Sequence, residues 1–273
     1  MISPLVRIAA TADLHVRVRD DVANLREAFR DIEHEADLLL IAGDLTEMGL
    51  VAEMEMIAEV LAEIAIPVFV TLGNHDRRGM RRSALKNVLR SVGAIVLEGS
   101  GAVVALQNGT RVGIAGVTGT GGGFSATGED FGRGSRFSRA VMVKSRRESA
   151  RLRKTMKELT AENPDVLIMM SHFAPTTSTL GEEPVLKYWM LGNALLGKTI
   201  DEFNPNLVIH GHAHLGNETG ATEAGTPVLN VALPIVGGIR VLHIDEEGGY
   251  TPVGMRPIES PIRTTRVRES DVG

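Results

Sequence analysis

The stretch Ile66-Pro67-Val68-Phe69-Val70-Thr71-Leu72-Gly73-Asn74-His75-Asp76 joins an apolar run to an amide, an imidazole and a carboxylate in succession. Residues 66–72 predict a buried strand. The polar residues after it are poorly suited to a hydrophobic core and well suited to catalysis or ligand binding. They stand at the carboxyl end of the strand. Open α/β sheets bind their ligands at that end, because the loops that leave the strands project side chains into one crevice. The stretch therefore predicts a sheet and the edge of that sheet where function resides.

Four other apolar runs also end in residue types that bind metals. They cover residues 5–12, 37–42, 165–170 and 206–209, and they lead into Asp13-Leu14-His15, Gly43-Asp44, Ser171-His172 and His210-Gly211-His212-Ala213-His214. Five of the eight histidines are candidate ligands or catalytic groups of the five motifs: His15, His75, His172, His212 and His214. Such clustering after strands is far from a random scatter of histidine, and it predicts one site built from five strand ends.

The rest of the chain predicts an α/β fold in one domain. Helical spacing of apolar residues over 21–36, 50–64 and 77–90 separates the first strands, which indicates a mostly parallel half-sheet. Asn108-Gly109 between two apolar runs predicts a hairpin, because both residues tolerate positive φ. A further helix is expected over 192–203 and short strands over 226–253. We expect a single domain over 1–255 and a polar tail over 256–273.

Composition restricts the kinds of site and partner. The 273 residues carry a net charge of −5 and include no cysteine, which excludes disulfides, thiolate zinc sites and cysteine nucleophiles. Any metal must be held by His, Asp, Glu or Asn. Nothing in the overall charge marks a nucleic-acid or membrane binder, although local patches can differ. No signal-peptide pattern or apolar run of about 20 residues stands out, so we expect a cytoplasmic protein with no membrane partner.

Three features predict contacts with substrate. The glycine-rich stretch 119–140 lacks the pattern of a phosphate-binding P-loop and of a dinucleotide-binding loop, so a mobile loop or lid is expected. Arg77 and Arg78 follow the central motif and could attract an anion, although a solvated helix face is the plainer interpretation. Trp189, the only tryptophan, stands between two ligand strands; it is a core residue or a wall of a substrate pocket.

The candidate ligands are too many for one tetrahedral zinc ion. They comprise two carboxylates, one amide oxygen and four imidazoles: Asp13, His15, Asp44, Asn74, His172, His212 and His214. This set suits two divalent ions in octahedral or five-coordinate geometry that share a carboxylate. Manganese and iron are expected first and zinc is an alternative.

The ordered motifs Asp-x-His, Gly-Asp, Gly-Asn-His-Asp, His and Gly-His-x-His resemble those of the calcineurin-like metallophosphoesterases over about residues 8–214. The resemblance implies a four-layer α-β-β-α sandwich, with two mixed sheets flanked by helices. It implies that one metal is held by Asp13, His15 and His214 and the other by Asn74, His172 and His212, with Asp44 bridging both. It also implies that His75 contacts the phosphoryl oxygen or protonates the leaving group, while Asp76 orients its ring.

The chemistry expected of such a site is hydrolysis of a phosphoester. Two cations lower the pKa of a bridging water, and the resulting hydroxide can attack phosphorus in line. Protein phosphatases of this family extend the Gly-Asp motif with an arginine, whereas Gly43-Asp44-Leu45-Thr46-Glu47 has none. This difference favours the bacterial branch that resembles class III cyclic nucleotide phosphodiesterases, and Glu47 itself is interpreted as a helix-start or supporting acid.

A small phosphodiester is therefore the substrate expected first. The enzymatic alternatives are a phosphomonoesterase and a nuclease, the latter favoured only if the basic residues of 133–157 line the metal cleft. A non-catalytic binding scaffold is the alternative of another class, but it requires missing ligands and every motif here is complete. Nothing in the sequence indicates an oligomeric state.

Overall fold

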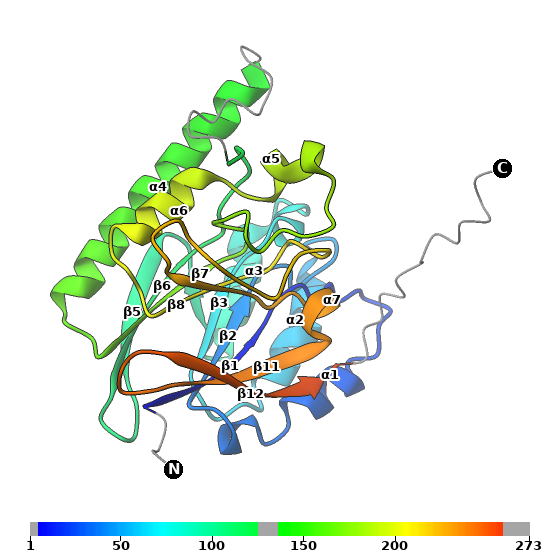
Figure 1. Ribbon diagram of the computed structural model, residues 1–273. Helices are drawn as coiled ribbons and strands as arrows, with labels where there is room; N and C mark the ends of the chain where they lie inside the picture. Colours follow the sequence, from blue (N-terminus) through cyan, green and yellow to red (C-terminus); the bar gives the residue numbers. More distant parts are fainter. Residues whose placement is uncertain (1–4, 125–135, 259–273) are drawn as a thin grey trace.

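Two six-stranded sheets lie face to face in the computed structural model, which describes residues 5–124 and 136–258 (Figure 1). The strand orders are β12-β11-β1-β2-β3-β4 and β5-β6-β7-β8-β10-β9. The strands are β1 Val6–Thr11, β2 Leu38–Ala42, β3 Val68–Thr71, β4 Ile95–Leu97, β5 Ser100–Ala105, β6 Arg111–Val117, β7 Val166–Ser171, β8 Leu207–His210, β9 Thr219–Ala221, β10 Pro227–Asn230, β11 Gly238–Ile244 and β12 Tyr250–Pro257. Both sheets are mixed, with parallel strands in the middle and antiparallel strands at one or both edges.

Helices cover the outer face of each sheet. The helices of the described chain are α1 Ala23–Phe29, α2 Val51–Leu61, α3 Arg82–Ser91, α4 Arg136–Ala161, α5 Tyr188–Leu191, α6 Ala194–Asp201 and α7 Leu233–Val236, with 3₁₀ turns η1 Ile32–His34, η2 His75–Arg77 and η3 Val185–Lys187. One apolar layer lies between the sheets, a second packs α1, α2 and α3 on the first sheet, and a third packs α4 and α6 on the second. The predicted four-layer α-β-β-α sandwich is confirmed.

The central strands are apolar along their whole length because both of their faces are buried. Every residue of β2 is fully buried, as expected for a parallel strand covered on both sides. β1, β2 and β3 run parallel in the first sheet, and β7 and β8 run parallel in the second. Their carboxyl ends meet where the sheets touch: the carbonyl of Ala42, the last residue of β2, lies 2.9 Å from Nδ1 of His172, which follows β7. Five separate strand ends are thereby brought to one edge.

Two of the expected helices begin or end elsewhere. The single helix predicted over 21–36 is wrong: α1 ends at Phe29, and Asp31 adopts a left-handed conformation with φ 55° before η1. Arg7 on β1 donates to the His34 carbonyl and pairs with Asp37, which pulls the chain onto β1 and stops a straight helix. The helix expected from residue 77 begins only at Arg82, because the chain first makes the turn η2 that carries His75.

The hairpin around Asn108-Gly109 is confirmed, since β5 and β6 pair antiparallel on either side of it. Of the predicted lid, residues 119–124 are packed against 189–192 through hydrogen bonds from Gly122 and Gly123, residues 136–140 belong to α4, and residues 125–135 lie outside the described chain. The predicted tail begins later than residue 256, because β12 runs to Pro257 and Ile258 is buried. Residues 259–273 lie outside the described chain.

Candidate metal centre

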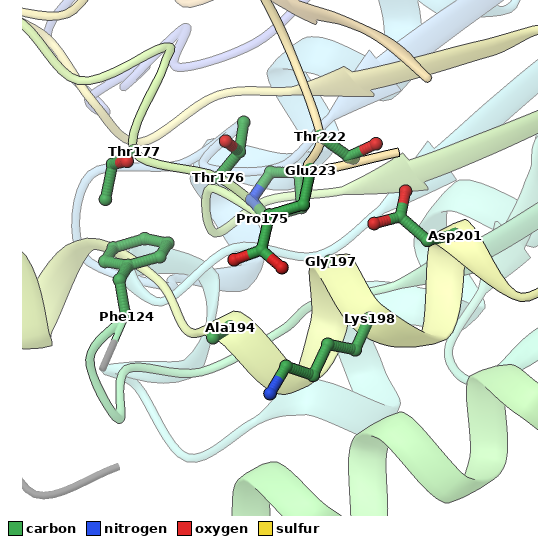
Figure 2. A pocket seen from close by; sticks show the side chains of 10 residues that line it. All are labelled: Phe124, Pro175, Thr176, Thr177, Ala194, Gly197, Lys198, Asp201, Thr222 and Glu223. Carbon is green, nitrogen blue, oxygen red and sulfur yellow. The ribbon is translucent and has the colours of Figure 1, made fainter. Parts of the chain in front are cut away.

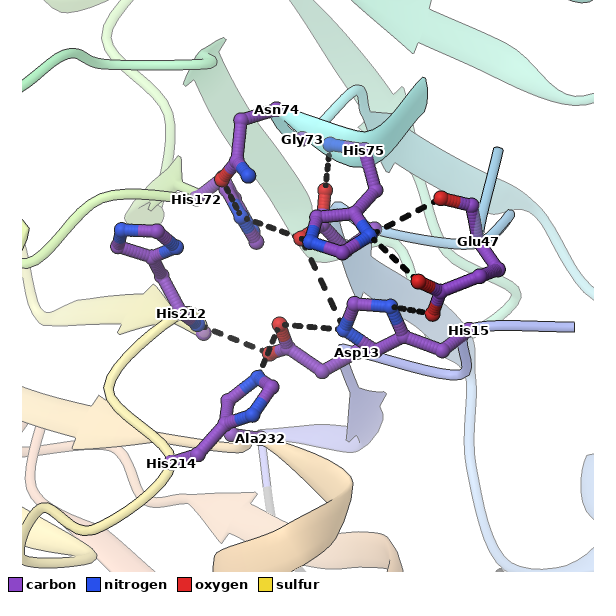
Figure 3. A network of polar contacts seen from close by, with 12 residues as sticks. Asp13, His15, Glu47, Gly73, Asn74, His75, His172, His212, His214 and Ala232 are labelled. Atoms are coloured by element: carbon purple, nitrogen blue, oxygen red, sulfur yellow. Dashed lines mark hydrogen bonds and ion pairs between the residues drawn. The ribbon is translucent and has the colours of Figure 1, made fainter. Parts of the chain in front are cut away.

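The predicted ligands meet at the shared edge of the two sheets (Figure 3). Eight non-glycine residues of the described chain have positive φ, and four of them are candidate ligands: Asp13, His15, Asp44 and His212. Left-handed backbone costs a non-glycine residue about 1–2 kcal/mol. Strain of this kind gathers at functional sites, where the surrounding fold over-determines it. The sharp turns after β1, β2 and β8 thus aim these side chains at one point.

Glycines of the motifs let the carboxylates approach the neighbouring backbone. A Cβ on Gly73 would collide with the Asp44 carboxylate, and a Cβ on Gly211 would collide with the carboxylate of Asp13. Asp44 Oδ1 accepts a hydrogen bond from the His75 amide at 2.7 Å, and Asp13 Oδ2 accepts one from the His212 amide at 2.9 Å. Each carboxylate is fixed by one oxygen, and its other oxygen faces the imidazoles.

The first group of ligands consists of Asp13, His15 and His214. Asp13 Oδ1 lies 2.9 Å from His214 Nε2 and 3.7 Å from His15 Nε2. Asp13 and His15 are buried, whereas the His214 side chain is 37% exposed. Donor atoms of all three lie within 4.8 Å of one another, which is close enough for one ion to bind them together.

The second group consists of Asn74, His172 and His212. His172 Nε2 lies 3.0 Å from Asn74 Oδ1, and the His172 and His212 ring centroids are 4.9 Å apart. His172 is fully buried. Asp44 belongs to both groups: its Oδ2 lies 3.2 Å from His172 Nε2 and 3.8 Å from His15 Nε2. The structure therefore brings all seven predicted ligands together around a carboxylate that faces both groups.

The protonation of the site reflects mutual attraction of carboxylates and imidazoles. Burial alone would raise the pKa of Asp13, but contacts with His15 and His214 and the charge of His172 hold that pKa well below its usual value. Burial alone would lower the pKa of His172, but Asp44 and Asp13 raise it to about 9. The pKa of His15 is raised in the same way. In the metal-free protein, protons on these imidazoles supply the positive charge that metal ions would otherwise supply.

The hydrogen bonds of the imidazoles fit metal binding. His15 Nδ1 lies 3.1 Å from the Glu47 carboxylate and His172 Nδ1 lies 2.9 Å from the Ala42 carbonyl. Since these partners are acceptors, the Nδ1 atoms carry the protons and the Nε2 atoms face the site with a lone pair in the neutral rings. His15 Nε2 is buried and has no hydrogen-bond partner among the described residues. A buried nitrogen facing two carboxylates without a bond is what a metal ligand needs.

His75 stands beside this centre and is held by Glu47 and Arg78. Its Nδ1 donates to the Glu47 carbonyl at 3.0 Å, and its Nε2 accepts from the Arg78 guanidinium at 2.7 Å. Burial, with the charges of His15 and Arg78, lowers the pKa of His75. The ring is therefore neutral in this structure, 4.0 Å from the Asp44 carboxylate.

Glu47 lies at the centre of the contacts around His15, His75 and Arg78, which the sequence did not predict. Its carboxylate contacts His15 and Arg78, while its carbonyl holds His75. The acid that caps helix α2 is instead Glu53, which accepts from the amides of Met48 and Leu50. A capping acid is expected three residues into a helix, and that spacing from Leu50 selects Glu53. The spacing that identifies Glu53 as the capping acid also indicates that Glu47 does not cap the helix and is a candidate residue of the site.

The prediction that Asp76 orients the His75 ring is wrong. The Asp76 carboxylate is fully buried and accepts from the Gly73 amide and from the amide and hydroxyl of Thr46. Burial raises the pKa of Asp76 above its usual value. Asp76 therefore ties the loop after β3 to the loop after β2 and supports the position of both, while the Glu47 carbonyl orients the ring.

The three predicted substrate residues are placed differently. Arg78 is exposed, and its guanidinium binds His75 beside the metal centre. Arg77 is turned away into the protein, where it donates to the Thr118 hydroxyl at 2.6 Å and faces Glu148 at 3.9 Å. Trp189 is half-buried on α5, and its carbonyl accepts from the Gly122 amide. The next carbonyl, of Met190, lies 3.2 Å from His212 Nε2, so this segment supports the second ligand group.

A separate cavity of about 100 Å³ lies beside α6 (Figure 2). Charged side chains of both signs, Lys198, Asp201 and Glu223, line it together with Phe124 and several small residues. None of its ten lining residues is a candidate ligand. The cavity is distinct from the metal centre. No helix in the described parts of the chain is long and apolar enough to cross a membrane.

Comparison with known proteins identifies the family and the fold. A model of the calcineurin-like phosphoesterases matches residues 6–216. No curated protein matches the chain. Among solved structures, the calcineurin-like phosphoesterase YfkN from Bacillus subtilis is 14% identical with a TM-score of 0.55, covering 95% of this chain and 92% of that one. TT1561 from Thermus thermophilus is 16% identical with a TM-score of 0.53, covering 91% of this chain and 98% of that one.

A structure from Staphylococcus aureus assigned as a 5′-nucleotidase is 16% identical with a TM-score of 0.53. It covers 97% of this chain, but this chain spans only 56% of its length. At these identities the structural likeness concerns the fold alone.

Proposed function

The chain belongs to the calcineurin-like phosphoesterases, which are hydrolases of phosphoesters, and from this premise we propose that it is a binuclear metal-dependent phosphodiesterase acting on a small phosphodiester. The observation that carries the proposal is the place of Asp44. Its carboxylate lies between His15 and His172, which belong to two different ligand groups. A carboxylate in that place can bind two ions at once, and one ion would leave half of the donors unused.

Each ion has a complete set of donors. Asp13, His15 and His214 would hold one and Asn74, His172 and His212 the other, with Asp44 shared. The mixture of oxygen and imidazole ligands suits manganese or iron, with zinc as the alternative. Two divalent ions bound there would supply an activated water molecule and neutralise charge on the phosphoryl oxygens.

The residues around the ions would position the substrate and handle protons. Arg78 is the exposed guanidinium at the centre, and a phosphoryl oxygen can accept the hydrogen bond that Arg78 now gives to His75. His75 Nε2 is then free to contact the phosphoryl oxygen or to exchange a proton with the leaving group. The Glu47 carbonyl keeps the other nitrogen of the ring protonated and its orientation fixed.

His75→Ala tests this role. We expect a loss of about 10²- to 10⁴-fold in kcat, typical of removing a general acid or base, while the metal content stays unchanged because His75 is outside both ligand sets. Elemental analysis of the same preparation provides the control. Equal losses of metal and of turnover would contradict the assignment.

A diester is favoured over the alternatives by the composition of the site. The loop after Asp44 presents Glu47 and no arginine, unlike the protein phosphatases. Two basic residues of α4 have acidic partners away from the centre: Arg153 pairs with Glu202 directly after α6, and Lys154 pairs with Glu158 on α4 itself. This part of the block does not line the centre and gives a nuclease no support. The likeness to a protein assigned as a 5′-nucleotidase keeps a phosphomonoesterase as the second candidate.

The direct test compares two chromogenic esters. Protein loaded with manganese is expected to hydrolyse bis-p-nitrophenyl phosphate faster than p-nitrophenyl phosphate, and both activities should disappear with a chelator and in Asn74→Ala. A faster reaction with the monoester would replace the diesterase proposal with a phosphatase. Absence of turnover with both esters in protein that holds two metals would contradict the proposed activity on simple esters.

A further inference from the structure

The side chain of Arg77 crosses from the first sheet to the second. Arg77 is the last residue of the turn η2, and its amide donates to the carbonyl of Asn74 at 3.3 Å. Its guanidinium donates to the hydroxyl of Thr118 at 2.6 Å. The turn η2 follows β3 of the first sheet, whereas Thr118 directly follows β6 of the second. Arg77 is thus bound to a candidate ligand through its backbone and to the opposite sheet through its side chain.

Thr118 holds the start of the loop that carries His172. Its carbonyl accepts hydrogen bonds from the amides of His172 at 3.0 Å and of Phe173 at 3.1 Å. Thr118 is buried, with 2% of its surface exposed. Because both of its contacts are made inside the protein, movement of one partner is passed to the other. Arg77 and Thr118 therefore form a continuous chain of contacts from Asn74 to His172.

Asn74 and His172 come from different sheets and have to meet at a short distance. Asn74 follows β3 and His172 follows β7, and Asn74 Oδ1 lies 3.0 Å from His172 Nε2 (Figure 3). Functional side chains must be held within about 0.5 Å of their working geometry. Ligands on a single loop share one backbone, whereas the separation of ligands on two sheets depends on contacts between the sheets. The hydrogen bond between Arg77 and Thr118 is a contact of this kind.

The burial of Arg77 is not explained by a close ion pair. Its side chain is only 22% exposed, and its Nε is buried without a hydrogen-bond partner among the described residues. Glu148 Oε1 lies 3.9 Å from Arg77 Nη1, which is too far for a hydrogen bond, and Lys144 attracts the same carboxylate. Burial lowers the pKa of Arg77, and the charge of Arg82 lowers it further. A guanidinium buried in this way costs folding free energy, so its presence indicates a role in position.

We propose that Arg77 is a positioning residue of the second metal site, and that its guanidinium fixes the separation of Asn74 and His172 through Thr118. The inference rests on the proposed binuclear centre and adds to it a side chain outside both ligand sets. The sequence suggested that Arg77 could attract an anion, but the side chain is directed at the support of the ligands. Asp76 supports the same loop from the other side, because it binds the loop after β2.

Titration of Mn²⁺ into the metal-free full chain tests the proposal in Arg77→Met, which keeps an unbranched apolar side chain and removes the guanidinium. One of two binding steps should weaken by about 10- to 100-fold, as for loss of groups that orient metal ligands, while the other is unchanged. Adding Glu47→Gln, which is directed at His15 in the other site, should weaken both steps. Arg82→Met is the matched control, since Arg82 donates to Glu98 and no contact of its side chain with a candidate ligand is described. It should leave both steps unchanged.

The Thr118 hydroxyl is tested separately. Thr118→Val removes the acceptor and keeps the carbonyl that binds the amides of His172 and Phe173. Since Arg77 acts through this hydroxyl, Thr118→Val should weaken the same binding step as Arg77→Met. The double variant should be no weaker than the more affected single variant, because both changes break one contact. Arg77→Lys, which keeps a cation able to donate to the hydroxyl, should restore part of the affinity.

The outcomes separate this inference from the proposed function. Unchanged binding of Mn²⁺ by Arg77→Met, beside a native chain that binds two ions, would overturn the role of Arg77 and leave the binuclear centre intact. Saturation of the native chain at one ion would contradict the centre and this inference with it. In chelator, Arg77→Met should unfold at a temperature close to that of the native chain. A lower unfolding temperature, with both binding steps weakened equally, would assign Arg77 to the stability of the fold instead.

Discussion

The two halves of the metal centre hold their imidazoles by different means. In the first half, a side chain holds the ring: the Glu47 carboxylate binds Nδ1 of His15. In the second half, the backbone does so: the Ala42 carbonyl binds Nδ1 of His172, and the Met190 carbonyl contacts Nε2 of His212. A carboxylate can be changed by one substitution, whereas a carbonyl is present whatever the residue. The imidazole contact in the first half can therefore be removed by a single substitution, whereas the contacts in the second half come from the backbone of the fold.

Asp44→Ala breaks both halves at once, so it should have a larger effect than a change confined to one half. It removes the oxygen that faces His15 and His172, and it leaves the His75 amide without its acceptor. We expect activity to fall by about 10²- to 10³-fold or more, as for the loss of a central electrostatic group, with fewer than two metals retained. Activity near that of the native chain, measured with bis-p-nitrophenyl phosphate, would contradict the shared role of Asp44.

Glu47→Gln is expected to weaken the first half alone. Loss of a carboxylate behind a metal-bound imidazole lowers metal affinity or activity by about 10- to 100-fold. Titration of the metal-free protein should show one of two binding steps weakened and the other unchanged. Glu53→Gln is the matched control, since Glu53 on the first turn of α2 binds the amides of Met48 and Leu50 in the same loop and no imidazole contact of its side chain is described. Equal weakening of both steps would show that the halves are not independent.

The smallest expected effect is on pH dependence, and it separates the metal-free from the metal-bound protein. The pKa of His172 is raised to about 9 from its ordinary 6.5, so the stabilisation that it gives is complete below about pH 6.5 and is lost as pH rises through about 9. His210 and His212, with pKa values lowered to about 4 and about 3, stay neutral across this window.

Metal binding requires the neutral imidazoles, so metal affinity should rise over the same window in which the metal-free fold loses stability. In denaturant unfolding between about pH 6.5 and about pH 9, stability should fall with rising pH in chelator and should not fall with saturating manganese. Two parallel slopes would mean that protons and metals do not compete for these rings.

The sequence was sufficient to predict the location of those candidate site residues that directly follow an apolar run. Asn74 and His172 could be predicted because each follows a strand that is buried on both faces, and a parallel topology then brings strand ends together. The α/β class followed from the order of strands and helices, and the four-layer sandwich followed from the family resemblance. In these cases local pattern and global fold indicate the same answer.

Roles that depend on long-range contacts could not be predicted in this way. Asp76 stands next to His75 in the chain, yet its carboxylate binds Thr46, thirty positions away. The early end of helix α1 depends on Arg7 of strand β1, which donates a hydrogen bond to the carbonyl of His34. The orientation of Arg77 towards Thr118 is likewise set by tertiary packing. Residues that are adjacent in the sequence share a loop, but long-range contacts determine which way each side chain points.

The proposed pair of metal ions, joined by Asp44, can be detected by electron paramagnetic resonance of the manganese-loaded protein. Titration of Mn²⁺ into metal-free protein should saturate at two ions per chain, with the signal of an exchange-coupled pair appearing as the second ion binds. Asp44→Asn should abolish the coupled signal. Saturation at a single ion per chain, or two ions with no magnetic coupling in the native protein, would contradict the binuclear site.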